Sequence, residues 1–181
     1  AKIIKVGKNT LPGEGQLVED GVYFIEALLT GQHLTSPTFD PNNVRMVAAS
    51  EAGDQKWEIT HLENNIYNIK NIQSDRFLNV ANASCANDAN VITSTNSSAT
   101  NSRWIISKQG EEFFFRPLHC STRAMDYQRD PNKNTVIWDF SIGNNNQRFI
   151  IKPATTTQVP EGFLTIDGVY LIKNRVNAQN V

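Results

Sequence analysis

The sequence has little of what several specialised classes of protein require. Among 181 residues there are only two cysteines and three scattered histidines, which argues against a metal site. No apolar run approaches bilayer-spanning length, so we expect no membrane insertion by this chain. The net charge is −1, which gives no basic surface for nucleic acid or anionic membrane. Nothing in the composition implies a cofactor.

Motifs of common enzyme chemistries are missing as well. The sequence has no glycine-rich phosphate loop, no H-E-x-x-H and no G-x-S-x-G. His119 and Cys120 are neighbours, but adjacent side chains on a strand point to opposite faces. We therefore expect a protein without catalysis. Cys85 and Cys120 occupy unrelated positions, and both a disulfide and two buried thiols remain open.

What the sequence does contain is a series of short β-strand patterns. Segments such as VYFIEAL, KWEITHL and RWIISKQ are rich in β-branched and aromatic residues, and Gly, Asn, Asp, Ser and Pro separate them. One stretch, 43–52, has a helix-like composition, but its counterparts elsewhere in the chain favour strand followed by turn. The pattern predicts an all-β fold of twelve short strands in three units of four.

The three units are visible as a repeat. The tripeptides QKW, SRW and QRF end at Trp57, Trp104 and Phe149, which lie 47 and then 45 residues apart. Further anchors keep the same register in each unit: Tyr23, Tyr67 and Phe114; Leu34, Leu78 and Met125; Val44, Val91 and Val136; Ile59, Ile106 and Ile151. Length changes fall in polar stretches, as expected for surface loops between core strands. A threefold repeat favours equivalent binding pockets over one reaction centre.

These anchors and tripeptides resemble the ricin-B-type β-trefoil lectins over residues 21–152. Only QKW keeps the full Q-x-W motif, since SRW lacks the glutamine and QRF the tryptophan. The resemblance implies a β-trefoil, in which a six-stranded barrel is capped by three hairpins and offers up to three shallow sugar pockets. The same fold also serves protease inhibitors and toxin targeting domains.

The domain organisation predicted from the repeat has four parts. Residues 1–20 form an N-terminal extension, 21–153 the trefoil and 154–162 a linker. Residues 160–170, PEGFLTIDGVY, restate residues 12–23, PGEGQLVEDGVY, so we interpret 163–181 as the opening strands of a possible second trefoil. The alternative is a duplicated strand that packs on the first domain or on a neighbouring chain.

The third unit is the predicted sugar site. In the family an acid follows the apolar anchor and an amide accompanies Q-x-W, and only this unit offers both. The resemblance gives the expected ligand-binding residues as Asp126, Tyr127, Trp138, Asp139, Asn145, Asn146 and Gln147. The second unit has the neutral Asn79 at the acid position, and the first has Thr35.

Several of these residues have structural alternatives. Asp126 precedes a turn-like segment and is a candidate turn acceptor. Gln147 is expected to tie the hairpin to the barrel. Trp138 lies two residues after Val136 and so shares its face. If that face belongs to the core, Trp138 is a packing residue and Tyr127 or another loop aromatic must stack on the sugar.

Three functions agree with the sequence. The leading hypothesis is a lectin that binds galactose- or N-acetylgalactosamine-type glycans and glycoproteins, with avidity from a second trefoil or a homo-oligomer. The second is a receptor-targeting module of a larger toxin. The third is a protease inhibitor acting through a variable loop such as 36–43 or 82–90.

Overall fold

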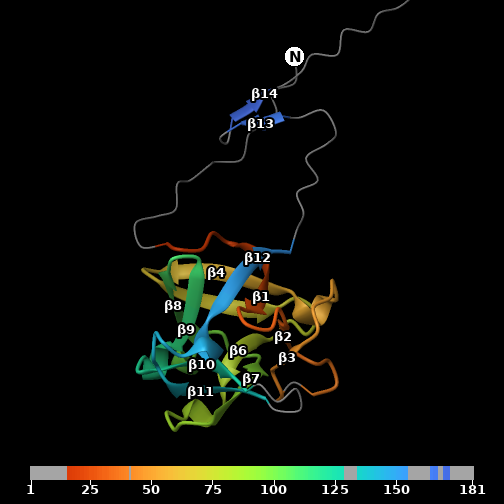
Figure 1. Cartoon of the computed structure of the whole chain (residues 1–181). Helices are drawn as coiled ribbons and strands as arrows, with labels where there is room; N and C mark the ends of the chain where they lie inside the picture. The colour runs from red at the N-terminus through yellow and green to blue at the C-terminus, as the bar shows by residue number, and fades with distance from the viewer. Residues whose placement is uncertain (1–15, 41, 129–133, 155–163, 167–168, 172–181) are drawn as a thin grey trace, which may run out of the picture.

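Twelve strands in three successive sets of four form the body of the molecule (Figure 1). The computed structural model describes residues 16–40, 42–128, 134–154, 164–166 and 169–171. The first set is β1 (Gly21–Ala27), β2 (His33–Thr35), β3 (Arg45–Val47) and β4 (Trp57–Glu63). The second is β5 (Ile66–Asn71), β6 (Phe77–Val80), β7 (Ala89–Ser94) and β8 (Arg103–Gln109). The third is β9 (Glu112–Pro117), β10 (Arg123–Tyr127), β11 (Thr135–Asp139) and β12 (Phe149–Pro153).

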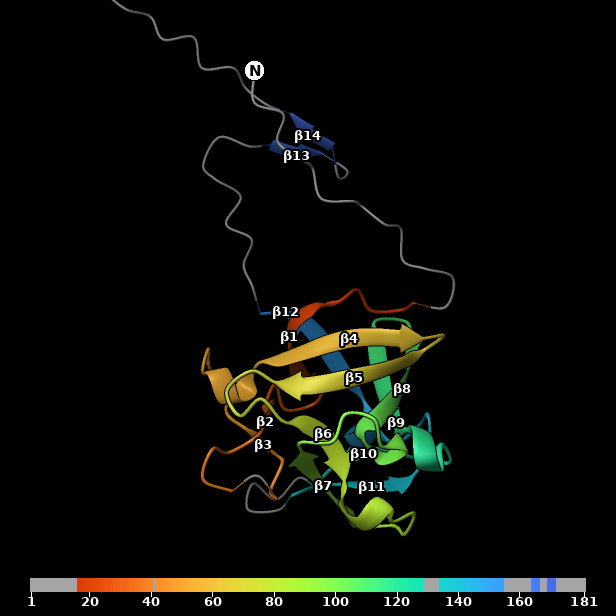
Figure 2. The same cartoon turned by 180° about the vertical axis from the view of Figure 1, so that it is seen from behind.

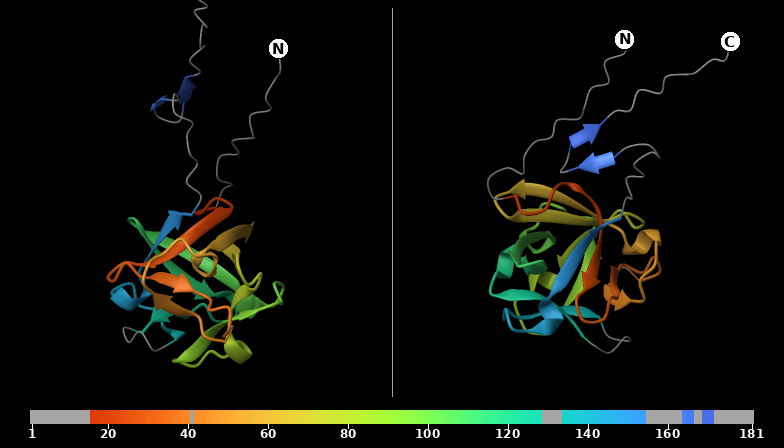
Figure 3. Two further views of the ribbon diagram at one scale, coloured as in Figure 1. Left: turned by 90° about the vertical axis from the view of Figure 1, so that its right-hand side faces the viewer. Right: turned by 45° about the horizontal axis from the view of Figure 1, so that its top comes forward.

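The outer strands of each set close into a six-stranded barrel. Antiparallel pairing runs from β1 to β4, β5, β8, β9 and β12, and β12 pairs again with β1. Closure satisfies the backbone groups that would otherwise line two open sheet edges. Figure 2 views the molecule from behind and shows β4 and β5 lying across the barrel. Figure 3 shows β1 beside β12. The predicted twelve-stranded β-trefoil is confirmed.

The inner strands of each set form hairpins that meet at one end of the barrel. These hairpins are β2–β3, β6–β7 and β10–β11. The Val44 N–H donates to the Val91 carbonyl at 3.3 Å, and the Thr135 N–H donates to the Val44 carbonyl at 2.7 Å. Val136 pairs with Asn90 of β7, so the three anchoring valines lie where the hairpins meet. The stretch 43–52, with its helix-like composition, contains β3 followed by irregular backbone and no helix. This agrees with the prediction made from the equivalent segments of the other two repeats.

The aromatic anchors fill the core between barrel and hairpins. Trp57, Trp104 and Phe149 are fully buried, as are Tyr67, Ile59, Ile69 and Ile106. Each buried side chain of this size stabilises the fold by about 1.5–3 kcal/mol relative to exposure. Tyr23 and Ile151, two further anchors of the repeat, are partly buried and pack against this core.

Two of the three motif aromatics also make a polar contact. The indole Nε1 of Trp57 donates to the Leu34 carbonyl at 2.8 Å, and that of Trp104 donates to the Leu78 carbonyl at 2.9 Å. Each contact joins the start of a barrel strand to the hairpin of the same repeat. Phe149 has no such donor, so this residue contributes to the junction of the third repeat by packing alone.

A disulfide joins the second and third repeats. Cys85 and Cys120 are bonded, with their Cα atoms 5.8 Å apart, which settles the choice between a disulfide and two thiols. Cys85 lies just after the short 3₁₀ turn η2 (Ala81–Ala83), and Cys120 ends the turn η4 (Leu118–Cys120). The bond therefore ties the β6–β7 loop to the β9–β10 connection.

The chain beyond the barrel contains one more described element. β13 (Leu164–Ile166) and β14 (Val169–Leu171) pair antiparallel as a hairpin. Residues 1–15 of the predicted extension and 155–162 of the predicted linker lie outside the described residues. A second trefoil beginning near residue 163 therefore stays a prediction. Within the described part of the chain, no helix has the length and apolar character needed to cross a membrane.

We expect Trp57→Phe to lower the free energy of unfolding by about 1–3 kcal/mol, because it removes a buried N–H···O contact and part of a packed side chain. Trp104→Phe should behave in the same way. Urea denaturation of both variants beside the wild type measures the effect. Phe149→Leu, which changes packing at the equivalent position without removing a hydrogen bond, is the matched control. Unchanged stability in both tryptophan variants would contradict a structural role for the indole N–H.

Candidate functional site

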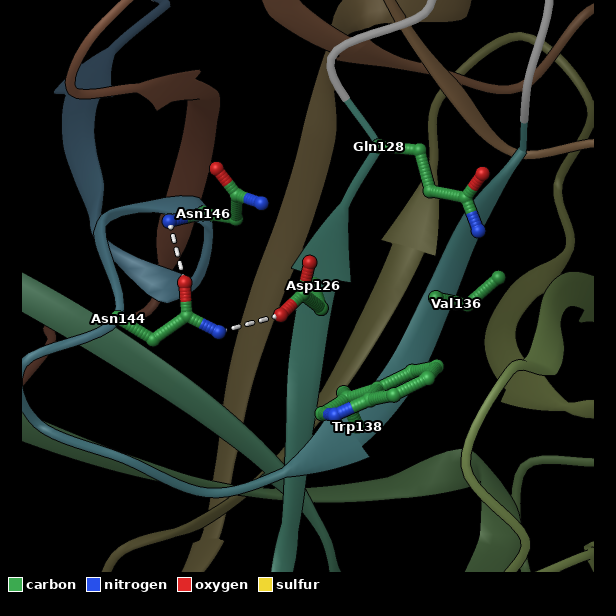
Figure 4. Close-up of a pocket in the computed structure, with 6 residues that line it drawn as sticks. All are labelled: Asp126, Gln128, Val136, Trp138, Asn144 and Asn146. Carbon is green, nitrogen blue, oxygen red and sulfur yellow. Dashed lines mark hydrogen bonds between the residues drawn. The ribbon is translucent and has the colours of Figure 1, made fainter.

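A polar pocket of about 280 Å³ lies on the third repeat, outside the β10–β11 hairpin (Figure 4). Its lining side chains come from the hairpin and from the loop that leads to β12: Asp126, Gln128, Val136, Trp138, Asn144 and Asn146. Figure 4 shows Asp126 between the two asparagines and the strand that carries Val136 and Trp138. The pocket combines one carboxylate, several amides and one aromatic ring.

The register of the hairpin explains why these residues share one face. Asp126 pairs with Val136, and Ala124 pairs with Trp138. Residues directly opposite one another in an antiparallel pair point to the same side of the sheet, and so do residues two apart on one strand. Asp126, Gln128, Val136 and Trp138 therefore project together, away from the core.

Asp126 forms the centre of the pocket and is nearly buried, with 7% of its surface exposed. Its Oδ2 accepts hydrogen bonds from Asn144 Nδ2 at 2.8 Å and from Gln147 Nε2 at 3.1 Å. Burial raises the pKa of the Asp126 carboxyl above its ordinary value, and the amides of Gln147, Asn144 and Asn146 offset part of that rise. The Asp126 carboxylate is thus held in place by the neutral amides of Asn144 and Gln147.

Trp138 is the aromatic side of the pocket. It is 43% exposed, whereas its counterparts Met46 and Thr93 are 4% and 1% exposed. The sequence left open whether the face it shares with Val136 belongs to the core, and the structure places that face in the pocket. A half-exposed indole beside a carboxylate presents an apolar surface suited to the C–H face of a sugar ring.

Tyr127 does not reach the pocket. It is 1% exposed and belongs to the hydrophobic core, where its ring lies 6.0 Å from that of Phe149 in an edge-to-face arrangement. The physical reason is the alternation of the strand, because Tyr127 follows Asp126 and so points to the opposite side. The structure therefore separates Tyr127 from the other predicted site residues.

Gln147 lies behind the pocket lining and holds Asp126 in position. It is fully buried, and its Nε2 donates both to Asp126 Oδ2 and to the Asp139 carbonyl at 3.0 Å. Its Oε1 accepts from the Ser141 N–H at 3.0 Å. The side chain thus joins the loop after β11 to the acid of β10. Gln147 positions Asp126 and is not itself part of the pocket lining.

The predicted asparagines divide between two roles. Asn146 lines the pocket, and its backbone N–H donates to Asn144 Oδ1 at 3.0 Å. Asn145 is exposed and does not line it. Asn144–Asn145–Asn146 open the 3₁₀ turn η5 (Asn145–Gln147), in which Asn144 serves as the N-cap. The tight turn brings the side chains of Asn144 and Asn146 toward Asp126 and leaves the side chain of Asn145 in solvent.

Asp139 lies outside the pocket although Trp138 precedes it. Its carboxylate pairs with Arg123 and accepts from Asn87 Nδ2 at 2.8 Å. Its backbone N–H donates to Asn87 Oδ1 at 2.9 Å. The strand alternation that directs Trp138 into the pocket directs Asp139 toward the β6–β7 loop.

Three lining residues were missed by the sequence prediction: Gln128, Val136 and Asn144. Gln128 and Val136 carry a usable signal, because each lies two residues from a predicted site residue, Gln128 directly after β10 and Val136 on β11. Gln128 is held by its own partner, since its Nε2 donates to Asp88 Oδ1 at 2.8 Å. Asn144 has no comparable signal. Its contact with Asp126 depends on the η5 turn and on the path of the preceding loop.

In the second repeat the same face is closed by internal hydrogen bonds. Asn79, at the acid position, donates to Ser102 Oγ at 2.7 Å and accepts from Asn101 Nδ2 at 3.2 Å. Asn101 also donates to the Val80 carbonyl at 2.8 Å. Arg76 covers Thr93, the counterpart of Trp138, by donating to its hydroxyl and its carbonyl. The side chains of Asn79, Asn101 and Thr93 therefore already have hydrogen-bond partners within the protein.

In the first repeat the corresponding positions are buried by packing. Thr35, at the acid position, is 3% exposed and donates to the His33 carbonyl at 3.0 Å. Met46 takes the place of Trp138 and is also buried. The Ser36 N–H donates to the Asp54 carbonyl at 3.0 Å, which draws the β2–β3 loop against η1 (Gly53–Gln55). At the positions equivalent to Asp126 and Trp138, the first repeat therefore has neither a carboxylate nor an aromatic side chain.

Comparison with known families identifies the repeat. Residues 53–134 match the family described as ricin-type beta-trefoil lectin domain-like. No curated protein sequence matches the chain. The matched residues span the end of the first repeat, the second repeat and the first half of the third, including Asp126.

Solved structures share the fold over about three quarters of the chain. A designed threefold-symmetric protein, ThreeFoil, is 27% identical, with a TM-score of 0.68 and coverage of 74% of this chain and 99% of that chain. The Polyporus squamosus lectin, bound to a sialylated influenza-binding epitope, is 16% identical, with a TM-score of 0.67 and coverage of 74% and 49%. The Macrolepiota procera ricin B-like lectin in complex with lactose is 14% identical, with a TM-score of 0.64 and coverage of 75% and 98%.

Some similar structures are much longer proteins. An exo-beta-1,3-galactanase from Clostridium thermocellum and an endo-beta-galactosidase from Clostridium perfringens match over 30% and 32% of their chains. The present chain spans less than a third of each, and 49% of the Polyporus squamosus lectin. A trefoil of this kind thus occurs both alone and as one part of an enzyme.

The raised pKa of Asp126 predicts a specific pH dependence of stability. The folded protein binds the Asp126 proton more tightly than the unfolded chain, so the carboxyl favours the folded state at low pH. This contribution is lost as the pH rises through the folded-state pKa. We expect Asp126→Asn, which keeps the shape and the acceptor oxygen, to remove this loss. The variant should be at least as stable as the wild type at neutral pH.

Urea denaturation of wild type and Asp126→Asn between pH 3.5 and 7 measures the difference directly. The difference in the free energy of unfolding between the wild type and Asp126→Asn should change with pH around and above the ordinary aspartate pKa of about 3.9. Glu111→Gln, at an exposed side chain on the β8–β9 turn, is the matched control for loss of one negative charge. A wild-type protein that gains stability over Asp126→Asn as the pH rises would contradict the predicted direction.

Proposed function

We propose that the trefoil of this chain, which matches the ricin-type beta-trefoil lectin domain-like family over residues 53–134, binds galactose- or N-acetylgalactosamine-type glycans through the pocket of the third repeat, without catalysis. The observation that carries the proposal is the joint placement of Asp126 and Trp138 on one open face, with Asn144 and Asn146 opposite. The first and second repeats lack this combination.

The chemistry of the pocket suits a hexose. A carboxylate accepts two hydrogen bonds from neighbouring hydroxyls, and amides supply both donors and acceptors for the same groups. Galactose-type sugars also present an apolar C–H face that packs on an aromatic ring, which Trp138 would provide. Asp126 is held by Gln147 and Asn144, so its oxygens are oriented before a ligand arrives.

A single open pocket of this size implies weak binding by one domain. Few ligand atoms are enclosed, and the partly exposed indole retains contact with water. Useful affinity for cell-surface glycans would then require several domains acting together, through self-association or through a further trefoil in the same polypeptide.

We expect a glycan array to show binding to galactose- or N-acetylgalactosamine-terminated glycans and not to mannose-terminated ones. Asp126→Ala should abolish binding, and Trp138→Ala should weaken it at least tenfold, because they remove the hydroxyl acceptor and the stacking surface. Titration calorimetry with lactose or N-acetylgalactosamine gives the affinities. The matched control is Asn79→Ala, the equivalent of Asp126 in the second repeat, which should bind as the wild type does.

Two results would contradict the assignment. Binding by Asp126→Ala at wild-type affinity would place the sugar elsewhere, and loss of binding in Asn79→Ala would move it to the second repeat. A correctly folded protein that binds no glycan on the array would reject the lectin function and favour the targeting or inhibitor alternatives. Circular dichroism of each variant separates loss of the site from loss of the fold.

Sugar affinity should also depend on pH in mild acid. The protonated Asp126 carboxyl is a weaker acceptor than the carboxylate, and its pKa is raised by burial, so protonation begins at a higher pH than for an exposed aspartate. Affinity for lactose should therefore fall as the pH is lowered toward and through that pKa, by up to about tenfold per pH unit below it. Calorimetry at pH 4–7 tests this, with the fold checked at each pH. An affinity that rises on acidification would be inconsistent with an ionised Asp126 as the hydroxyl acceptor.

A further inference from the structure

The β6–β7 loop of the second repeat contacts both backbone neighbours of Trp138. The Asp88 N–H donates to the Ile137 carbonyl at 2.9 Å. On the other side, Asn87 and Asp139 bond reciprocally: Asn87 Nδ2 donates to Asp139 Oδ2 at 2.8 Å, and the Asp139 N–H donates to Asn87 Oδ1 at 2.9 Å. The strand segment that carries Trp138 is thus fixed before and after this residue by a loop from another repeat.

The same loop reaches the opposite rim of the pocket and the strand beside it. Asp88 Oδ1 accepts from Nε2 of the lining residue Gln128 at 2.8 Å. Arg123, at the start of β10, donates through Nε to the Cys85 carbonyl at 2.9 Å and also pairs with Asp139. Residues 84–88 therefore contact both strands of the hairpin that forms the pocket.

The loop is exposed and depends on a covalent anchor. Cys85 is bonded to Cys120, and the His119 Nε2 lies 3.1 Å from the Ser84 carbonyl. Asp88 adopts a left-handed backbone conformation, with φ of 69°, which an aspartate tolerates at some cost in energy. Solvent-exposed hydrogen bonds by themselves hold a loop only weakly. The disulfide limits the excursions of the loop and so keeps these contacts formed.

We propose that residues 84–88, anchored by the Cys85–Cys120 disulfide, are the positioning element for Trp138, so that sugar binding in the third repeat responds to the thiol redox state. This inference rests on the proposed function of that pocket. Asn87 is the main positioning residue, since its amide bonds both the backbone and the side chain of Asp139. Asp139, predicted from sequence as a ligand-binding residue, acts through Trp138 instead.

The redox step is a two-electron exchange with a dithiol such as dithiothreitol. The S–S bond between Cys85 and Cys120 is reduced to two thiols, and the dithiol is oxidised to its cyclic disulfide. The released loop then holds residues 137–139 less firmly. Because an aromatic platform contributes most when it is already oriented, the pocket loses affinity without losing a contact residue.

Fluorine NMR of protein labelled with 5-fluorotryptophan tests this directly. The three tryptophans give three signals, and Trp138→Phe identifies that of Trp138. We expect Asn87→Ala, and reduction of the wild type, to shift or broaden the Trp138 signal while the Trp57 and Trp104 signals stay in place. Affinity for lactose should fall about three- to tenfold in both cases. Asn96→Ala is the matched control, because Asn96 holds a loop of the same repeat through Ser98 and Ala99 without contacting β11.

A rescue variant separates positioning from general stability. Asn87→Asp should weaken lactose binding through repulsion from Asp139, and the further change Asp139→Asn should restore it by exchanging donor and acceptor. An unchanged Trp138 signal in both Asn87→Ala and the reduced protein would overturn the proposal, as would joint movement of all three signals. If the oxidised wild type binds neither lactose nor N-acetylgalactosamine, the proposed function fails, and the Trp138 signal still decides whether the loop positions that residue.

Discussion

The first and third repeats depend on a buried glutamine that holds the loop between the hairpin and the next barrel strand in place. In the first repeat Gln55 Nε2 donates to the Ala48 carbonyl at 3.0 Å, and its Oε1 accepts from the Ser50 N–H at 2.7 Å. Gln147 makes the equivalent pair of bonds in the third repeat. A buried side chain that satisfies two backbone groups fixes the loop firmly, because losing it would leave both unpaired in the interior. The second repeat has Ser102 at this position, which reaches only the side chain of Asn79.

The third repeat uses this contact for a further purpose. Gln147 also donates to Asp126, so the residue that holds the loop orients the acid of the pocket. Burial of that acid opposes its ionisation, and neutral amides offset the effect without cancelling its charge. The burial of the Asp126 carboxylate lowers the stability of the fold at neutral pH, and the same burial orients an acceptor for sugar hydroxyls in the proposed site. The proposed site therefore lies in the repeat whose Q-x-W motif has lost its tryptophan, and where no indole N–H supports the hairpin.

The pocket also depends on neighbouring repeats, which limits what sequence comparison of the three units can show. Trp138 is presented by a strand whose backbone is bonded to Asn87 and Asp88 of the second repeat. The cysteine that anchors this loop has no counterpart at equivalent positions of the other units, so the repeat pattern does not predict it. The threefold symmetry of the barrel is thus accompanied by contacts that make the third face different from the other two.

Sequence by itself determined the fold, because the register of Tyr67, Leu78, Val91 and Trp104 with their counterparts records which faces are buried, and burial is periodic along a strand. It also singled out Asp126 as the acid, since the equivalent positions hold Thr35 and Asn79. Only the tertiary structure decided that the face of Trp138 is open, that Tyr127 is buried and that Asn144 reaches the acid. Those outcomes depend on the path of the loops and on contacts between repeats, which join residues far apart in the chain and leave no periodic trace in it.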